Sequence, residues 1–236
     1  MDGYDESRKL YSDTLRGDED AAVAFLAARA GGGPVLELGI GAGRIALPLA
    51  ARGVCVEGLD ISAPTVEQMR AKPGGEKIPV MLADFTEVPV AGAFRLIYVV
   101  WNTFFNLSSQ DAQVRCFEQV AAHLTPVGMF VIEAYTPSFL HRLRSDQYVD
   151  AESIKLDEVC LDVLRHDAAA QRLEENHVRL TQSGITFAPV VQRYAWPSEL
   201  DLMARLAGLK LKERWGGWGR EPFVSDSKLH VSVYSK

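Results

Sequence analysis

The stretch at residues 34–50, PVLELGIGAGRIALPLA, decides the fold. It begins as an apolar run of strand length, passes through Gly39, Gly41 and Gly43, and ends in the apolar spacing of a helix. Glycines at such a turn let the backbone approach a ligand at the carboxyl end of a sheet, where the crevice of open α/β folds lies. The stretch therefore predicts the first strand, turn and helix of a nucleotide-binding domain.

Strand-length apolar runs alternate with helix-length patterns up to residue 137. A helical pattern at 14–30 precedes them. The predicted strands lie at 35–40, 54–61, 78–85, 95–102 and 128–136, and the helices between them at 43–53, 62–74 and 111–126. This alternation requires right-handed crossovers, and it predicts a parallel sheet that is covered on both faces.

A different pattern follows residue 137. Apolar and polar residues alternate with a period of two at 154–167, 172–182 and 185–196, which predicts an antiparallel meander. A helix at 198–209 and strands at 209–215 and 228–235 follow. We expect an α/β fold whose mainly parallel sheet ends in a C-terminal antiparallel hairpin, with an antiparallel insertion after the fifth strand.

The chain is expected to form a single domain, residues 1–236, with four parts. These are an N-terminal helical cap at 1–33, a cofactor-binding core at 34–137, an insertion at 138–196 for substrate or dimer contacts, and the C-terminal helix and strands of the core at 197–236. One face of the insertion carries apolar residues that the core or a partner must cover, namely Val159, Leu161, Val163 and Phe187. A homodimer is therefore expected.

Composition and charge exclude several classes of partner. The 236 residues carry 25 Lys and Arg against 31 Asp and Glu, and the net charge of −6 argues against binding to nucleic acid or to an anionic membrane. No apolar run approaches the roughly 20 residues of a membrane span, and the polar N-terminus is unlike a signal peptide, so we expect a cytoplasmic protein. Metal-site spacing of Cys and His is missing from the sequence, and no metal is expected. His166 and His177, at ends of the meander strands, are expected to be solvated.

Acidic residues at the ends of three successive strands indicate which nucleotide the turn binds. Glu37, two residues before the first glycine, would repel a diphosphate and suits a ligand with an ammonium group. Asp60 ends the second strand, where a carboxylate accepts hydrogen bonds from a ribose diol. Asp84 ends the third strand beside Phe85, and an acid with an aromatic ring suits adenine. A nucleoside that carries an amine and lacks phosphate is expected, and S-adenosylmethionine has these features.

The same residues carry a resemblance to a known family. VLELGIGAG (35–43) resembles motif I of class I S-adenosylmethionine-dependent methyltransferases, GLDIS (58–62) resembles their ribose-binding motif, and ADFTEV (83–88) their adenine-binding motif. RLIYVVWNTFFNL (95–107) resembles the fourth-strand motif, although Arg95 replaces the usual Asp. The chain is most similar to small-molecule tailoring methyltransferases of the amino-sugar and antibiotic type, which carry an antiparallel insertion after the fifth strand.

The resemblance implies a Rossmann-like sheet, S-adenosyl-L-methionine as methyl donor and S-adenosyl-L-homocysteine as product. The residues expected to bind this cofactor are Tyr11, Glu37, Gly39, Gly41, Gly43, Asp60, Ile61, Asp84, Phe85 and Trp101. Trp101 is placed to meet the sulfonium by a cation–π contact, and Tyr11 lies in an N-terminal segment that the family often folds over the cofactor.

The methyl acceptor is expected to be a small, partly apolar molecule. Asn102 and Phe105 after the fourth strand, and Trp218 in the aromatic-rich loop WGGWGREPF, are the expected substrate contacts. Methyl transfer depends mainly on positioning, and a general base contributes only if the acceptor must lose a proton. Glu133, Tyr135 and His141 around the end of the fifth strand are the candidates for that role. The choice among them, and among N, O and C as acceptor atom, stays open.

Two other functions remain as alternatives to methyl transfer. An NAD(P)-dependent oxidoreductase would need the spacing G-x-G-x-x-G, whereas Arg44 stands at the position of its third glycine and Glu37 precedes the first. A non-catalytic module could instead bind S-adenosylmethionine and use the meander only to dimerise.

Overall fold

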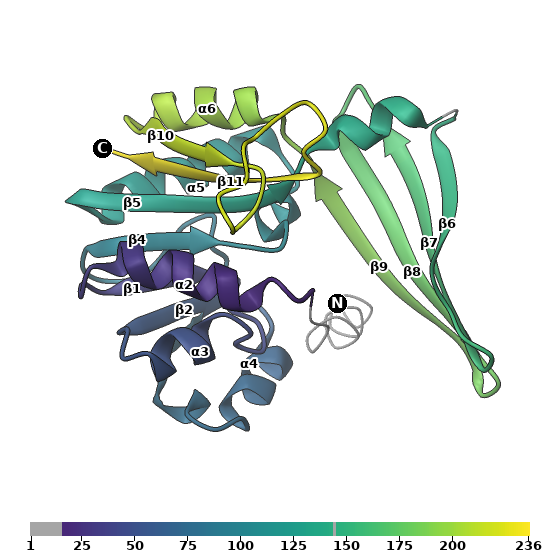
Figure 1. The fold of residues 1–236 in the computed structure, drawn as a ribbon, viewed down its shortest axis with the longest axis horizontal. Coiled ribbons are helices and arrows are strands. Elements are labelled where there is room, and N and C mark those ends of the chain that lie inside the picture. Colours follow the sequence, from purple (N-terminus) through teal and green to yellow (C-terminus); the bar gives the residue numbers. More distant parts are fainter. Residues whose placement is uncertain (1–15, 144) are drawn as a thin grey trace.

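The computed structural model describes residues 16–143 and 145–236, so Tyr11 lies outside the described residues. Two separate sheets dominate the structure, and the second projects beyond the end of the first (Figure 1). Among the described residues, no helix is both long and apolar enough to cross a membrane.

The first sheet has seven strands in the order β10-β11-β5-β4-β1-β2-β3. Strands β3, β2, β1, β4 and β5 run parallel, while β11 pairs antiparallel with β5 and β10 pairs antiparallel with β11. This arrangement confirms the predicted parallel sheet with a C-terminal hairpin. The strands are β1 (Val35–Leu38), β2 (Val56–Asp60), β3 (Val80–Leu82), β4 (Phe94–Val99), β5 (Leu124–Tyr135), β10 (Lys210–Trp215) and β11 (Leu229–Ser235).

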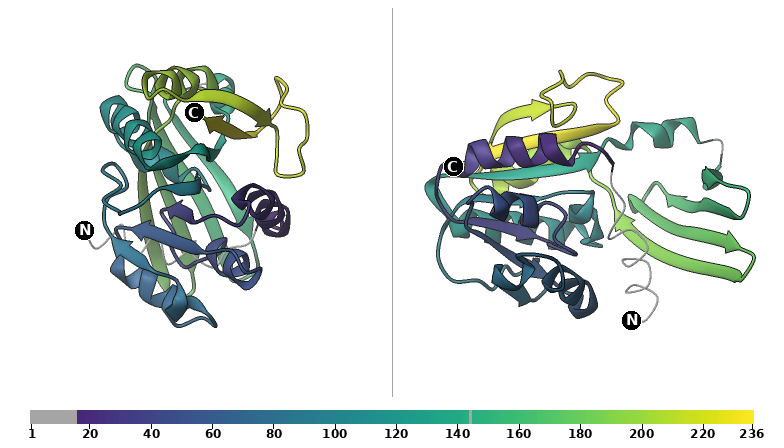
Figure 2. Two further views of the ribbon diagram at one scale, coloured as in Figure 1. Left: turned by 90° about the vertical axis from the view of Figure 1, so that its left-hand side faces the viewer. Right: turned by 60° about the horizontal axis from the view of Figure 1, so that its bottom comes forward.

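Helices cover both faces of this sheet, which the end-on view of Figure 2 shows. On one face the apolar side chains of α2 (Glu19–Ala30), α3 (Ala46–Ala51) and α4 (Ala63–Arg70) pack on the strands, and on the other those of α5 (Gln110–His123) and α6 (Pro197–Leu206). Short 3-10 turns lie at η1 (Gly75–Lys77), η2 (Thr103–Asn106) and η3 (Pro137–Arg142). Two apolar cores, one on each face, therefore hold the sheet.

The helix after the glycine turn begins later than predicted, at Ala46 and not at Gly43. Gly39, Gly41 and Gly43 have φ angles of 73°, 55° and 77°, which belong to the left-handed region and cannot start a right-handed helix. At Gly39 a Cβ atom would lie 2.5 Å from Cγ2 of Thr103. The turn therefore requires glycine here for its conformation and for close approach.

The second sheet is an antiparallel meander of four strands, inserted between β5 and α6 as predicted. Its strands are β6 (Gln147–Ile154), β7 (Glu158–Asp167), β8 (Arg172–Thr181) and β9 (Gly184–Arg193). Only the last three were predicted. The sequence gives no alternation for β6, since all of its residues except Ser153 are exposed. An edge strand with two wet faces lacks the period of two on which such a prediction rests.

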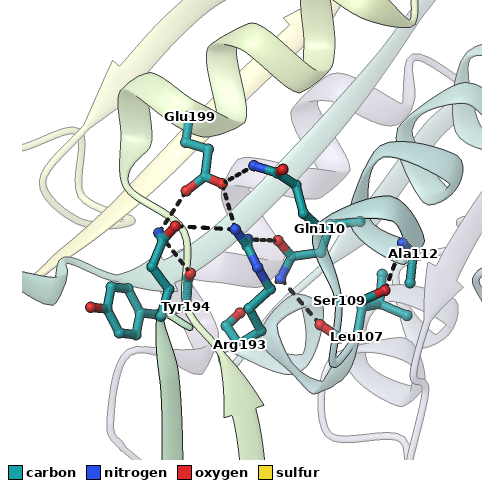
Figure 3. A network of polar contacts seen from close by, with 9 residues as sticks. Leu107, Ser109, Gln110, Ala112, Arg193, Tyr194 and Glu199 are labelled. Carbon is teal, nitrogen blue, oxygen red and sulfur yellow. Dashed lines mark hydrogen bonds and ion pairs between the residues drawn. The ribbon is translucent and has the colours of Figure 1, made fainter. Parts of the chain in front are cut away.

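A buried polar cluster joins the second sheet to the first (Figure 3). Arg193, at the end of β9, donates from Nη1 to Oε1 of Gln113 on α5 (2.6 Å) and from Nη2 to Oε1 of Glu199 on α6 (2.7 Å). Gln113 in turn donates from Nε2 to the Arg193 carbonyl (2.7 Å). Gln171, before β8, accepts from Arg193 (3.1 Å) and donates to Glu199 (2.8 Å). One guanidinium thus fastens the meander to two core helices.

Replacing Arg193 by Met is expected to lower the free energy of unfolding by about 3 kcal/mol, because Glu199 would keep a largely buried charge without its partner. Urea denaturation would measure the change. Arg165→Met is the matched control, since that side chain is 63% exposed in its ion pair with Glu174, and it should cost under about 1 kcal/mol. Equal losses in the two variants would contradict a joining role for Arg193.

Candidate active site

A cavity of about 720 Å³ lies between the carboxyl edge of the first sheet and one face of the second. Its core side contains the glycine turn and the ends of β1, β2, β4 and β5, with Glu37, Gly39, Gly41, Arg44, Asp60, Trp101, Asn102 and Tyr135. Its other side comes from the meander, with Tyr148, Glu152, Asp162, Leu164, Leu173, Glu175, His177, Val190 and Gln192. The cavity therefore has one wall from each sheet.

Asp60 holds the glycine turn in place. Its side chain is 1% exposed, and its two oxygens accept hydrogen bonds from the backbone N–H groups of Gly41 (2.8 Å) and Ser62 (2.9 Å). Asp60 also lines the cavity, at the edge where β2 ends. The predicted neighbourhood of Asp60, Gly39 and Gly41 is thus brought together at one wall.

Glu37 is a buried acid at the bottom of the same wall. It is 2% exposed and accepts a hydrogen bond from the hydroxyl of Tyr98 (2.8 Å). Burial raises the pKa of Glu37 to about 8, although the Tyr98 bond and the charge of Arg44 act in the opposite direction. A buried carboxyl of this kind becomes easier to ionise when a cation arrives beside it. Glu37 lies in the cavity lining, and its contact with an ammonium group stays a prediction.

Two arginines that sequence reasoning did not assign to the site lie against Trp101. The guanidinium carbon of Arg44 is 3.2 Å from the centre of the Trp101 ring, and that of Arg16 is 4.9 Å away. Burial, and then the charge of Arg16, lower the pKa of Arg44. Nη1 of Arg44 is buried with no hydrogen-bond partner among the described residues. A buried, unpaired donor next to a second cation favours an anionic ligand group such as a carboxylate.

Trp101 and Asn102 form a strained turn at the end of β4. Their φ angles of 57° and 60° are left-handed, which costs a residue with a side chain roughly 1–3 kcal/mol. Oε2 of Glu133 accepts from the Trp101 N–H (2.7 Å), and Oδ1 of Asn102 accepts from the Tyr135 N–H (2.7 Å). The other oxygen of Glu133 accepts from Arg16 (2.7 Å). Glu133, predicted as a catalytic candidate, is fully buried by these contacts and positions the cavity wall.

Three residues predicted to meet the acceptor lie away from the cavity lining. His141 is exposed, and its ring stacks on Trp196 at 5.3 Å. Phe105 is fully buried, with its ring 4.9 Å from that of Tyr135, and Trp218 is 5% exposed against Phe25 of α2. For Phe105 and Trp218 the reason is burial, because aromatic residues near a site serve the core as readily as the ligand.

Several predicted cofactor residues also lie outside the lining. A Cβ atom on Gly43 would lie 2.5 Å from Met69, so this glycine serves the packing of α4. Phe85 is 4% exposed in the apolar core, and Ile61 is 55% exposed. Asp84 is exposed and accepts from the Thr86 N–H (2.8 Å). Asp84, Phe85 and Ile61 keep their places at the ends of β2 and β3, and their contact with the cofactor stays a prediction.

The wall from the meander is acidic. We call Glu152, Asp162, Glu175 and His177 the acidic wall, and all four line the cavity. Nδ1 of His177 lies 2.6 Å from Oδ1 of Asp162 and 3.7 Å from Oε2 of Glu152, and its Nε2 lies 3.9 Å from Oε2 of Glu175. Burial raises the pKa of Glu175. Burial opposes the charge on His177, but the bond to Asp162 and the nearby acids outweigh it and raise the pKa of His177.

Sequence reasoning expected His177 to be solvated, and this was wrong. The residue lies in the middle of β8 and not at its end, with its side chain on the face that looks toward the cavity. The sequence did contain a signal for this position. Leu173, Glu175 and His177 are spaced two residues apart, so their side chains lie on the same face of the strand, and Leu173 is buried. Charged residues on the otherwise apolar face of a strand indicate that this face lines a cavity.

Known proteins with similar sequences and structures are methyltransferases. Residues 35–128 match the model of the methyltransferase domain family. The CcbJ methyltransferase from Streptomyces caelestis is 35% identical and superposes with a TM-score of 0.93 over 99% of this chain and 97% of its own. Cypemycin N-terminal methyltransferase from a Streptomyces species is 26% identical over 87% of this chain and 84% of that protein. CalS10, an amino pentose methyltransferase from Micromonospora echinaspora solved with S-adenosylmethionine, shares the fold at 19% identity and a TM-score of 0.69, covering 95% of this chain and 94% of its own.

A mainly parallel sheet that ends in an antiparallel hairpin, with a glycine turn and acids at its carboxyl edge, is the architecture of the class I methyltransferases. The chain belongs to the S-adenosylmethionine-dependent methyltransferases and resembles their small-molecule tailoring members. It is therefore an enzyme that uses S-adenosylmethionine.

Asp60→Asn is expected to weaken binding of S-adenosylmethionine by about 10- to 100-fold, because an amide accepts fewer and weaker hydrogen bonds from a diol. Titration calorimetry would measure the dissociation constant. Glu57→Gln, on the same strand and outside the cavity lining, is the control and should bind as the unaltered enzyme does. Unchanged affinity in Asp60→Asn would remove this residue from the cofactor site.

Cofactor binding at pH 7 is expected to release a proton from Glu37, because a carboxyl with a pKa of about 8 is mostly protonated there and must ionise to meet an ammonium. Calorimetry in buffers of different ionisation enthalpy would count the protons. Glu37→Gln should release fewer protons than the unaltered enzyme. The same proton count in both proteins would contradict this role.

Proposed function

We propose that this enzyme transfers the methyl group of S-adenosylmethionine to an amine nitrogen of a small, partly apolar molecule. The observation that carries the proposal is the acidic wall, which places three carboxylates across the cavity from the glycine turn. The cations among the described lining residues, Arg16 and Arg44, stack on Trp101 at the core wall. The meander side of the cavity thus has the charge that attracts an ammonium group.

On the core wall, the cofactor would be held by groups of complementary charge. Glu37 would meet the ammonium of its methionine part, and Arg44 with Arg16 would meet the carboxylate. Asp60 would accept from the ribose diol, with Gly39 and Gly41 leaving room for it. When bound, S-adenosylmethionine supplies a methyl group on a positively charged sulfur. A contact between that sulfur and the Trp101 ring stays a prediction, because the guanidinium of Arg44 lies against the ring.

On the meander wall, the remaining lining suits a molecule with an apolar part. Leu164, Leu173 and Val190 lie on the same sheet face as the acidic wall. Phe139 and Tyr148 add aromatic surface. A ligand with one amine and a compact apolar body would fit such a lining, since the acids select its charge and the apolar groups its shape.

The relatives support an amine acceptor. One is named an N-terminal methyltransferase and another an amino pentose methyltransferase, and both names refer to molecules that carry an amino group. Nothing in the comparisons supports an oxidoreductase, and the family is one of enzymes, which disfavours a purely binding module.

The four-part division of the chain follows the same proposal. Residues 34–137 would bind the cofactor and 138–196 the acceptor, with 1–33 as a cap and 197–236 completing the core. The outer face of the meander carries the exposed Val163 and Phe187, so the homodimer stays a prediction, as does the cytoplasmic location.

Pairs of small molecules that differ only in an amine against a hydroxyl, such as an amino sugar and the parent sugar, would test the proposal. With S-adenosylmethionine labelled in its methyl group, we expect label on the amine and at least a hundredfold less on the hydroxyl compound. Asp60→Asn serves as the low-activity control. It is assayed at a concentration of S-adenosylmethionine below the raised dissociation constant of this variant. Preferred labelling of the hydroxyl partner would overturn the amine proposal and leave methyl transfer itself intact.

A further inference from the structure

We propose that His177, held by Asp162, accepts the proton that the acceptor amine must lose. The inference rests on the proposed function and assigns its proton transfer to the meander. It gives the reaction a catalytic residue outside the methyltransferase core, on a meander strand whose histidines were expected from the sequence to be solvated.

The first support is the pairing of Asp162 and His177 across two strands. They are directly opposite one another in the β7–β8 ladder, on the face that lines the cavity. Nδ1 of His177 lies 2.6 Å from Oδ1 of Asp162, so this nitrogen donates to the carboxylate. The neutral ring then carries its lone pair on Nε2. An acid that orients the ring in this way is a common arrangement for a histidine that accepts a proton.

Further acids surround the ring. Glu175 on β8 has its Oε2 3.9 Å from Nε2, and Glu152 on β6 has its Oε2 3.7 Å from Nδ1. The ladder between β6 and β7 shifts register between Ala151 and Ser153, at Glu152 itself. Such an irregularity redirects a side chain, here into the lining of the cavity. An ammonium drawn to Glu175 would arrive on the Nε2 side of the ring.

Tyr135 gives a second, independent indication of a ligand at this place. Its hydroxyl is buried with no hydrogen-bond partner among the described residues, and its side chain lines the same cavity from the core side. Burial, and then the charge of Glu175, raise the pKa of Tyr135, so the hydroxyl stays protonated. A buried unpaired hydroxyl calls for a polar partner, and a heteroatom of the acceptor can supply one.

The other predicted bases are less suitable. Both oxygens of Glu133 are engaged, by Arg16 and by the Trp101 N–H, and its side chain is fully buried. His141 lies outside the cavity lining, stacked on Trp196. Among the described histidines, His177 is the one in that lining.

The proton balance is simple. The ammonium passes one proton to Nε2 of His177, and the freed nitrogen uses its lone pair to form a bond to the methyl carbon. The bond from that carbon to sulfur breaks, and its electron pair stays on sulfur, which becomes neutral. The methylated nitrogen takes the positive charge, and His177 later returns its proton to solvent. Asp162, Glu152 and Glu175 stabilise the imidazolium in between.

His177→Gln is expected to lower kcat at pH 7 by about 100-fold or more, with affinity for S-adenosylmethionine unchanged in calorimetry. The control is His166→Gln on the same sheet, whose ring contacts Tyr194 outside the cavity and whose loss should leave kcat within about twofold. A kcat of His177→Gln equal to that of the control would overturn the inference, even if amines are methylated.

Asp162→Asn supplies a readout that does not depend on turnover. The pKa of His177, raised above 6.5 by its acidic neighbours, should fall when Asp162 becomes neutral. NMR titration of the ring protons would measure it, with the signal assigned by its loss in His177→Gln. In the unaltered enzyme kcat should rise with pH through this pKa, and in Asp162→Asn the rise should move to lower pH by the same amount. A rise that does not follow the NMR pKa would refute proton transfer to His177.

A divalent cation is the rival occupant, because Glu152, Asp162 and His177 each place one suitable atom within 4.8 Å of the others. Activity abolished by EDTA and restored by Mn²⁺ or Zn²⁺ would overturn the proton-acceptor role. Full activity in EDTA supports it. If amines are not methylated at all while hydroxyl compounds are, the proposed function fails, and the NMR comparison then decides whether the His177–Asp162 pair exists.

Discussion

The buried guanidinium of Arg193 is the constraint on which the rest of the structure depends. The Arg193 cluster ties the end of β9 to α5 and α6 at once. The cavity has a wall on each sheet, so its shape is set by the angle at which this joint holds them. A charge-assisted cluster with several fixed partners specifies that angle more sharply than apolar contact would, because each bond has its own direction.

The core half of the enzyme could be read from the sequence, because its signals are local. Parallel strands buried on both faces appear as apolar runs, and their carboxyl ends meet at one edge, so Glu37, Gly39 and Asp60 could be placed together without coordinates. In the sequence, Arg44 was noted only because it stands where the dinucleotide-binding motif has its third glycine. Its stacking on Trp101 depends on the left-handed turn at Trp101 and Asn102, which no short sequence pattern predicts.

The meander wall of the cavity could not be predicted in the same way, because it is built from pairs of residues that are distant in the chain. Asp162 and His177 meet only through strand register, and Glu152 joins them at a register shift on a strand without alternation. A one-residue slip would have turned these side chains away. For Phe105 and Trp218 the sequence signal was local but ambiguous. Their aromatic-rich loops suggested contact with the substrate, whereas their burial assigns both side chains to the core.

The insertion of the meander at a single point, between β5 and α6, has an evolutionary consequence. Under the proposed function, the methyl donor and the acceptor would be recognised by separate stretches of chain, one in each sheet (Figure 1). Mutations could then change the meander wall while the glycine turn and its acids stay as they are, and related enzymes could take different acceptors without a change in how the methyl donor is held. Exchange of this one segment between relatives is the route by which such diversification would be expected to proceed.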